Sequence, residues 1–376
     1  MKARPSRPSE RRPGGGLRCL FVGQVISQMG DSIYMIALMW LVLELTGSKA
    51  AMGTEPALSH LPILLFGLLG GVAADVYNRR RVMLAADALR AMAVLVLPLA
   101  MLTGTVGLGL IYAVTFVSAL GIVFFNPARD AIVPELVSPT RLIKANSLIQ
   151  ASHFGAMLLG PALAAMLLSV VDLVHLFTID AATFVVSFVA ISLIRYKPAA
   201  RRETARGLGT MHLREVVQYL LKARRLRFLL ALTAINNFFI MGPAIVGTPV
   251  FVKEILNQDV THYAWVESAL GLGMVLGAFL VNVAARSLGQ GKLLLLGMLF
   301  DGLTYAVLYF CGSTLCLAAL VAFHALGIPF IIVSRTALIQ EWVPTGMQGR
   351  VFGLVGMAVV GTTAVSCGAV GVLAES

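Results

Sequence analysis

The chain has 376 residues, of which 58% are hydrophobic and only 12% are charged. Soluble domains carry roughly 45–50% apolar and 25% charged residues, so a soluble protein of this composition could not cover its surface with polar groups. The net charge is +11, but the basic residues are confined to a few short stretches, which argues against a nucleic-acid-binding face. Four cysteines without a C-x-x-C pair exclude a disulfide scaffold. The composition predicts an all-α polytopic membrane protein.

Runs of about 20 apolar residues are long enough to cross the hydrocarbon core of a bilayer. Reading the chain for such runs predicts eleven spans: 17–44, 56–76, 81–103, 107–129, 142–170, 173–195, 227–252, 262–286, 292–311, 314–335 and 350–374. Arginines precede the first run, as they precede a signal peptide. This run is too long for a signal peptide and contains Asp31, so we expect it to remain as a helix.

The basic residues predict the orientation of these spans. If the spans alternate in direction, 27 of the 29 Lys and Arg residues lie on the side of the N-terminus, and only Lys49 and Lys253 lie on the other side. An excess of Lys and Arg marks the cytoplasmic side of a membrane protein. We therefore expect a cytoplasmic N-terminus.

The longest connection divides the chain into two halves. The predicted parts are a basic cytoplasmic tail (1–16), a six-helix half (17–195), a cytoplasmic linker (196–226) and a five-helix half (227–376). Within the linker, apolar residues share one helical face opposite several arginines and a lysine. This pattern predicts an amphipathic helix at the anionic inner surface of the membrane, where an anchoring role is favoured over a regulatory one.

Shifting the chain by 206 residues aligns the two halves with each other. Residues 119–137 then match residues 325–343 at nine of nineteen positions, including Arg129 with Arg335, and Asp31 lies opposite Asn237. Six spans separate the copies, so the repeats run in the same direction. The sixth span would recur near 379–401, so the second repeat is expected to lack its last helix.

Residues 71–81 (GVAADVYNRRR) resemble the signature G-x-x-x-D-R-x-G-R-R of the major facilitator superfamily, whose transporters consist of two parallel six-helix repeats. Val76 and Asn78 depart from this signature. The resemblance implies a major-facilitator fold and a cytoplasmic charge lock that holds one conformation. The matched arginines at the ends of spans four and ten are expected to act at the same gate, which gives the predicted lock residues Gly71, Asp75, Arg79, Arg80, Arg129 and Arg335.

Other stretches resemble the bacterial drug and siderophore exporters of this superfamily, including macrolide-efflux and enterobactin-exporter proteins. They are Gly30-Asp31 and residues 45–48, 126–129 and 349–353. Gly160 and Pro161 resemble the antiporter signature G-P-x-x-G-G, although two alanines replace its final glycines. Gly160 and Pro161 are expected to form a hinge in span five, and the alternative is a simple helix-packing contact.

Polar groups inside a membrane span are costly and mark functional sites by default. Asp31 lies near the middle of span one and is the predicted proton-coupling residue. A hydrogen-bonded structural role and direct substrate contact remain as alternatives. Residues predicted to line the substrate cavity are Gln24, Gln28, Tyr34, His153, Asp180, Asn237 and Asp301. Asp87 and Arg90 have a spacing of three residues, which predicts a local ion pair in span three.

No arrangement of residues indicates a nucleophile, a phosphate-binding loop or a metal site, so we expect no enzyme activity, cofactor or metal. Without a nucleotide site, an ion gradient must supply the energy. The predicted protein is a monomeric, proton-coupled exporter of an amphipathic drug, macrolide or siderophore, working by alternating access in the bacterial cytoplasmic membrane. The alternatives are a lysophospholipid or metabolite permease of the same fold and a truncated membrane protein without transport activity.

Overall fold

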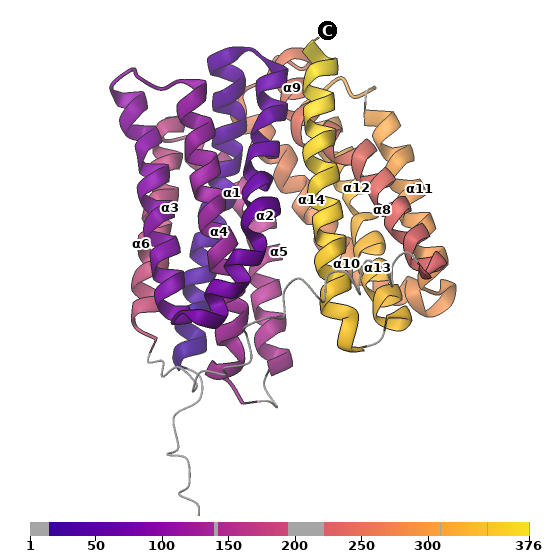
Figure 1. Ribbon diagram of the computed structural model, residues 1–376. Coiled ribbons are helices and arrows are strands. Elements are labelled where there is room, and N and C mark those ends of the chain that lie inside the picture. The colour runs from indigo at the N-terminus through magenta and orange to yellow at the C-terminus, as the bar shows by residue number, and fades with distance from the viewer. Residues whose placement is uncertain (1–14, 139–141, 195–221, 309, 344, 376) are drawn as a thin grey trace, which may run out of the picture.

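A computed structural model describes residues 15–138, 142–194, 222–308, 310–343 and 345–375. Within these ranges all regular structure is helical, and the helices form two bundles side by side (Figure 1). The first bundle contains α1 (Gly15–Thr46), α2 (Lys49–Val76), α3 (Arg79–Leu102), α4 (Leu108–Leu136), α5 (Leu142–Leu168) and α6 (Leu173–Ser192). The second contains α8 (Arg224–Gly242), η3 (Pro243–Gly247), α9 (Thr248–Val250), η4 (Phe251–Ile255), α10 (Val260–Leu288), α11 (Gln290–Leu308), α12 (Thr314–Ala325), α13 (Ile328–Trp342) and α14 (Thr345–Glu375).

Every predicted span coincides with one helix or with a series of joined helices, which confirms the all-α membrane fold. Ten helical segments of the described chain are long and apolar enough to cross a bilayer. The remaining span, α2, has 28 residues and includes Glu55 and His60, which interrupt its apolar run. The N-terminal tail and most of the predicted linker helix lie outside the described residues.

Short connections with side-chain caps set where several helices begin. Ser48 accepts a hydrogen bond from the backbone N–H of Ala51 at 3.1 Å, and so starts α2. Asn78 caps α3 in the same way, accepting from Arg81 N at 3.2 Å. Such caps satisfy backbone donors that the first helical turn leaves unpaired. Asn78, which departs from the superfamily signature, therefore has a structural role of its own.

The seventh span is one continuous helical path that contains two π-helical turns. Pro243 begins the first of these turns, and Pro249 lies in the short α9 between them. Proline lacks a backbone N–H, so it cannot complete the usual helical hydrogen bond, and a wider turn accommodates this loss. The second π turn ends the path and carries Lys253 and Glu254 toward the first bundle.

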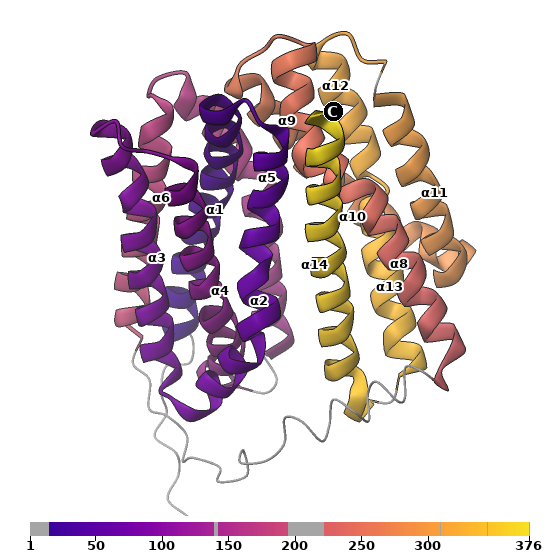
Figure 2. The ribbon, with the colours of Figure 1, turned by 45° about the horizontal axis from the view of Figure 1, so that its top comes forward.

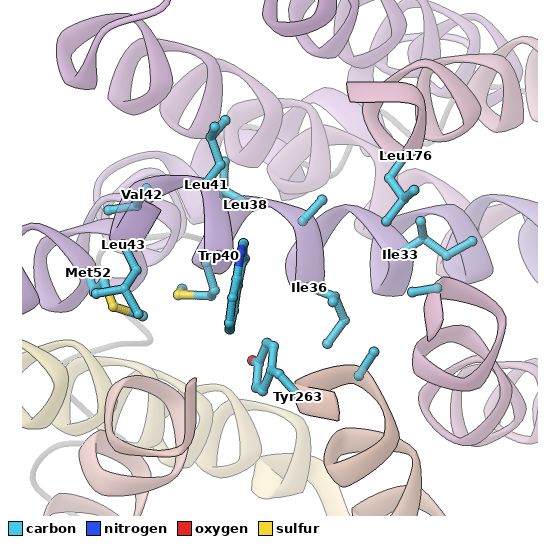
Figure 3. Close-up of a cluster of buried hydrophobic side chains, with 14 of the residues drawn as sticks. Ile33, Ile36, Leu38, Trp40, Leu41, Val42, Leu43, Met52, Leu176 and Tyr263 are labelled. Atoms are coloured by element: carbon cyan, nitrogen blue, oxygen red, sulfur yellow. The ribbon is translucent and has the colours of Figure 1, made fainter. Parts of the chain in front are cut away.

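The two bundles share one apolar cluster at the end where α1 passes into α2. Trp40 and Ile36 of α1 point toward Tyr263 of α10, as Figure 3 shows. Met52 of α2 and Cys367 of α14 belong to the same cluster. Burial of this apolar surface is the main attraction between the halves at this end.

Polar contacts reinforce the same end. Lys49 at the start of α2 forms an ion pair with Glu254 of η4, with 2.8 Å between Nζ and Oε2. Lys253 Nζ lies 5.5 Å from the centre of the Trp40 ring. Glu375, at the end of α14, accepts hydrogen bonds from Ser48 Oγ at 3.0 Å and from Ala50 N at 2.9 Å. We call this set of contacts and the shared cluster the closed end.

At the opposite end each half has its own apolar cluster. One is built from α1 to α6 around Met83 and Phe125, and the other from α8 to α14 around Met298 and Ile339. The halves are therefore joined at the closed end and have separate cores at the opposite end, where α2 passes into α3. In Figure 2 this opposite end lies at the bottom of both bundles.

Two glycines at equivalent positions of the repeat provide a test of helix packing. A side chain at Gly273 of α10 would collide with the backbone of Ala322 in α12, whereas a side chain at Gly67 of α2 would meet nothing within 4 Å. We expect Gly273→Leu to lower the stability of the purified protein by about 1–3 kcal/mol through overpacking. Gly67→Leu should leave thermal unfolding in detergent nearly unchanged. Equal effects of the two substitutions would contradict this packing.

Candidate functional site

The centre of the first half is an ion pair between α1 and α3. Arg90 Nη2 donates directly to Asp31 Oδ1. The Asp31 side chain is 36% exposed, whereas the Arg90 side chain is only 8% exposed. The guanidinium of Arg90 also lies 4.1 Å from the centre of the Phe184 ring of α6. The predicted local pair of Asp87 with Arg90 is wrong, because Arg90 crosses to α1 instead.

A glycine in α4 makes room for this arginine. A Cβ atom at Gly121 would collide with Cγ and Cδ of Arg90, so the stem of Arg90 lies directly against the α4 backbone. Gly121 belongs to the stretch that repeats in the second half, where Gly327 faces the ring of Phe300 of α11 in the same manner. Both halves therefore pack their third and fourth long helices through a glycine.

Two more carboxyl groups lie close to the ion pair. Asp87 of α3 and Asp180 of α6 are each 1% exposed, and the charges of both Asp31 and Arg90 act on each of them. Asp180 accepts a long hydrogen bond of 3.4 Å from Thr183. Asp31 alone contacts the guanidinium, whereas Asp87 and Asp180 are affected by its charge without an ion pair to it. A buried carboxylate without a cation is costly, so Asp87 and Asp180 depend on the charge of Arg90 nearby.

The predicted polar face of α1 is divided among three neighbouring helices. The Gln24 side chain accepts a hydrogen bond from Arg129 of α4 at 3.2 Å. Gln28 accepts from Ser152 of α5 at 2.9 Å. Next to these, the Tyr34 ring stands edge-on to Phe177 of α6, with 5.7 Å between the ring centres. The polar side chains therefore fix α1 against its neighbours on either side of Asp31.

His153 of α5 shares the exposed side of this region. Its side chain is exposed, and the charges of Arg129 and Asp31 both act on it. Of the predicted cavity residues, His153 is exposed, Gln28, Tyr34 and Asn237 are partly buried, and Asp180 is buried.

The two cavity residues predicted in the second half have different surroundings. Asn237 donates to Val359 O at 2.9 Å, Thr362 Oγ1 at 3.0 Å and Thr363 Oγ1 at 2.7 Å, all on α14. Asp301 of α11 is 2% exposed. Although Asn237 is the repeat equivalent of Asp31, it contacts α14 and does not reproduce the contacts of Asp31.

Two of the predicted lock residues bind the ends of helices within the first half. Arg79 forms an ion pair with Glu135 at 2.6 Å and donates to Ala131 O at 3.0 Å. Arg80 donates to the carbonyls of Ile191 and Ser192 at the end of α6. Positive charge at the carboxyl end of a helix is favourable.

The remaining predicted lock residues and the predicted hinge make fewer described contacts. Arg129 pairs with its neighbour Asp130, and Arg335 is half-buried on α13. Gly71 has open space beside it, and the side chain of Asp75 lies outside the described part. α5 passes through the predicted hinge, Gly160 and Pro161, without interruption, and Gly160 packs against Ser32 of α1.

Sequence reasoning missed two glutamates near the junction of the halves, the buried Glu55 and the partly buried Glu267. Glu55 of α2 is 2% exposed and accepts a hydrogen bond of 3.4 Å from Thr115 of α4. Glu267 lies on α10, and both glutamates act electrostatically on Tyr263. Glu267 was detectable, because it is an acid within a predicted span. Glu55 precedes the predicted start of span two, so it was assigned to the connection.

Two hollows in the second half have a purely hydrophobic character and lie away from these groups. Their volumes are about 410 and 420 Å³. The larger is bordered by leucines and phenylalanines of α10 to α13, together with Gly327. Side chains of this kind suit lipid contact on the outer face of a membrane bundle.

The sequence model of the Major Facilitator Superfamily matches residues 20–358, which is most of the chain. The chain belongs to the Major Facilitator Superfamily. Macrolide efflux protein A of Streptococcus pyogenes is 26% identical over 343 residues, covering 90% of this chain and 84% of that protein. Multidrug efflux pump Tap of Mycolicibacterium fortuitum is 24% identical over 355 residues, covering 91% and 85%.

Solved structures of transporters share the fold. The nucleoside transporter NupG matches with a TM-score of 0.78 at 12% identity, covering 96% of this chain and 91% of that one. A bacterial homologue of the iron transporter ferroportin, in its inward-facing state, matches with a TM-score of 0.75 at 16% identity, covering 95% and 91%. At these identities the likeness shows the superfamily fold alone.

A double-mutant cycle tests the central ion pair of this superfamily member. Arg90→Met removes the cation that balances Asp31, so thermal stability should fall by about 1.5–3 kcal/mol, the size of a hydrogen bond to a charged group. Asp31→Asn combined with Arg90→Met should cost less than the two single changes together, with a coupling of about 0.5–3 kcal/mol. Arg90→Met combined with Asp172→Asn is the matched control and should be additive. Additive effects for Asp31 as well would show that the pair does not stabilise the fold.

Proposed function

We propose that the protein is a proton-coupled exporter of an amphipathic small molecule, of the drug, macrolide or siderophore type, that works by alternating access. The observation that carries this proposal is the Asp31–Arg90 pair, which combines a buried cation with a half-exposed carboxylate inside a membrane bundle. The efflux functions named for two relatives agree with this direction of transport. Substrate, protons and lipid are the partners that this function requires, and we propose a monomer.

The distribution of basic residues supports a location in the bacterial cytoplasmic membrane with the N-terminus in the cytoplasm. The closed end, held by Lys49 and Glu254, then faces outward. The side with separate apolar clusters faces the cytoplasm. In an exporter, this is the conformation that loads substrate from the cell.

Proton coupling follows from the contacts of Arg90. A proton on Asp31 removes the negative charge that holds the guanidinium against α1. Asp87 and Asp180 are already within electrostatic reach of Arg90, so either can replace Asp31 as its partner. Such an exchange moves the attraction from α1 to α3 or α6. Because α1 also carries Trp40 and Ile36 of the closed end, the exchange connects protonation of Asp31 to the contacts of the closed end.

Asp31→Asn tests this coupling. Asparagine keeps the size and a carbonyl acceptor for Arg90 but cannot ionise. The variant in proteoliposomes should still bind a radiolabelled macrolide, and accumulation driven by an imposed pH gradient should fall at least tenfold. Asp172→Asn, at the exposed start of α6, is the control and should transport normally. Full gradient-driven transport by Asp31→Asn would end the assignment of Asp31 as the proton carrier.

Two carboxyl groups near the junction of the halves also favour a substrate that carries a positive charge. Glu55 is buried and Glu267 is partly buried, and both act electrostatically on Tyr263 of the shared apolar cluster. Within the described helices that meet there, no lysine or arginine forms an ion pair with either glutamate. Aromatic rings and carboxylates together suit a lipophilic amine better than an anionic siderophore.

Glu267→Gln measures this preference. Replacing a carboxylate by an amide removes attraction for a cation, so the apparent affinity for an amine-bearing macrolide should weaken about tenfold, which corresponds to about 1.4 kcal/mol. Affinity for an uncharged lipophilic dye should change little. Competition binding to purified protein gives both values. Equal loss for the two ligands would mean that Glu267 acts on the fold and not on substrate charge.

A further inference from the structure

A second polar cluster is buried in the second half, away from Asp31. It consists of Asp301 and Thr304 on α11, His324 on α12 and Asn236 on α8. His324 Nε2 lies 3.2 Å from Asp301 Oδ1, and His324 Nδ1 lies 2.7 Å from Thr304 Oγ1. Asn236 Nδ2 donates to Asp301 Oδ2 at 3.1 Å. Asp301, Thr304 and His324 are 2%, 6% and 2% exposed, so each needs its partners inside the protein.

The hydroxyl of Thr304 determines which nitrogen of His324 carries hydrogen. Thr304 Oγ1 lies 2.7 Å from the carbonyl oxygen of Phe300, one helical turn earlier. Two oxygens at this distance need a hydrogen between them, so the hydroxyl donates to the helix backbone. Its lone pairs then face the imidazole, and Nδ1 of His324 must be the donor. A neutral imidazole with hydrogen on Nδ1 presents a bare lone pair at Nε2.

Nε2 of His324 lies 3.2 Å from Asp301 Oδ1, an oxygen that has no hydrogen-bond partner among the described residues. An ionised carboxylate there would place a buried charged oxygen 3.2 Å from another acceptor. Asn236 satisfies only the other oxygen. Burying a carboxylate without a cation costs far more than burying a neutral acid. A proton on the Asp301 carboxyl removes both the charge and the repulsion.

We propose that Asp301 and His324 form a proton-binding site that holds one proton on the Asp301 carboxyl, between α11 and α12. The site is separate from the Asp31–Arg90 pair and differs from it in kind. Asp31 is half-exposed and has a cation as partner, whereas Asp301 is buried and has an imidazole and an amide. When the proton leaves, an uncompensated charge remains between α11 and α12, so the proton stabilises the packing of these helices.

The groups that surround the pair are consistent with one bound proton. On α11 itself, the Tyr305 ring stands edge-on to His324 with 4.8 Å between ring centres. From α10, Glu267 acts electrostatically on Tyr305, and α9 contributes Thr248 as its hydrogen-bonding neighbour. α8 contributes the uncharged Asn236. The charged residues of the adjoining α13 are Arg335 and Glu341, and no described ion pair links either of them to this site.

Counting protons tests the site without any transport measurement, so the result is independent of the proposed efflux function. The purified protein is unfolded with denaturing detergent at pH 5 in weak buffer, and released protons are measured with a pH indicator. At this pH an unfolded chain holds little proton on aspartate, and its histidines take up equal numbers of protons in the wild type and in Asp301→Asn. We expect the wild type to release one proton per molecule more than Asp301→Asn. The asparagine amide can donate to His324 Nε2, so this variant should fold.

Two further variants separate the possible outcomes. His324→Gln can donate to the Asp301 carboxylate, so it should release no more protons than the double variant Asp301→Asn with His324→Gln, which has the same remaining histidines. Asp172→Asn lies outside the site and should release nearly the same number as the wild type. Equal release by the wild type and Asp301→Asn would overturn the proposal. Release of one proton more by His324→Gln than by the double variant would place the proton on Asp301 without the imidazole and would overturn the shared site.

The pH dependence of stability supplies a second readout. Between about pH 4.5 and pH 6 the Asp301 carboxyl holds its proton in the folded chain and has lost it in the unfolded chain, so it raises the unfolding constant by up to about tenfold per pH unit. The apparent Tm of the wild type should therefore fall, relative to that of Asp301→Asn, as the pH rises from about 4.5 to about 6. Parallel curves for the two proteins would contradict the proton assignment.

Discussion

A cation buried within a membrane bundle constrains the whole first half of this protein. Arg90 cannot lose its charge, so the surrounding helices must supply a carboxylate, an aromatic face and space for its stem. Three different helices supply these groups. The carboxylate is Asp31 of α1, the aromatic face is Phe184 of α6, and the space for the stem lies at Gly121 of α4. The position of Arg90 on α3 thereby fixes the relative placement of four helices. It also makes any change in the charge of Asp31 a change in helix packing.

The second half also joins its first and third long helices by a polar contact, but with different residues. The contact there is between Asn236 of α8 and Asp301 of α11. No buried cation is required there, because His324 provides a neutral partner. Duplication has thus preserved where the polar contact lies in the bundle, while the residues that form it have changed. One half holds a salt bridge near solvent and the other, as we propose, a bound proton away from solvent.

The sequence predicted the membrane fold well because bilayer thickness and helix geometry leave few alternatives. Span positions and the parallel repeat follow from apolar runs and from a constant offset of 206 residues. Side-chain partners were harder to predict. Asp87 lies one helical turn before Arg90, yet the partner of Arg90 comes from α1, 59 residues away along the chain. Asn237 aligns with Asp31 but turns toward α14. Such choices depend on helix rotation within the bundle, which hydrophobic periodicity does not determine when nearly every face of a helix is apolar.

The closed end is held by two kinds of contact with unequal strength. Lys49 and Glu254 are partly exposed, with side-chain exposures of 22% and 39%, and such pairs contribute about 0–1 kcal/mol. Each fully buried side chain of the size of Met52 or Tyr263 contributes about 1.5–3 kcal/mol. The resistance of this end to opening therefore lies in the apolar cluster, and the ion pair mainly sets its alignment. A driving force that acts on α1 as a whole can separate that cluster, because Ile36 and Trp40 follow Asp31 on the same rigid helix. In the coupling that we propose, changing the charge of Asp31 applies such a force at one point of α1, and the helix transmits it to the closed end.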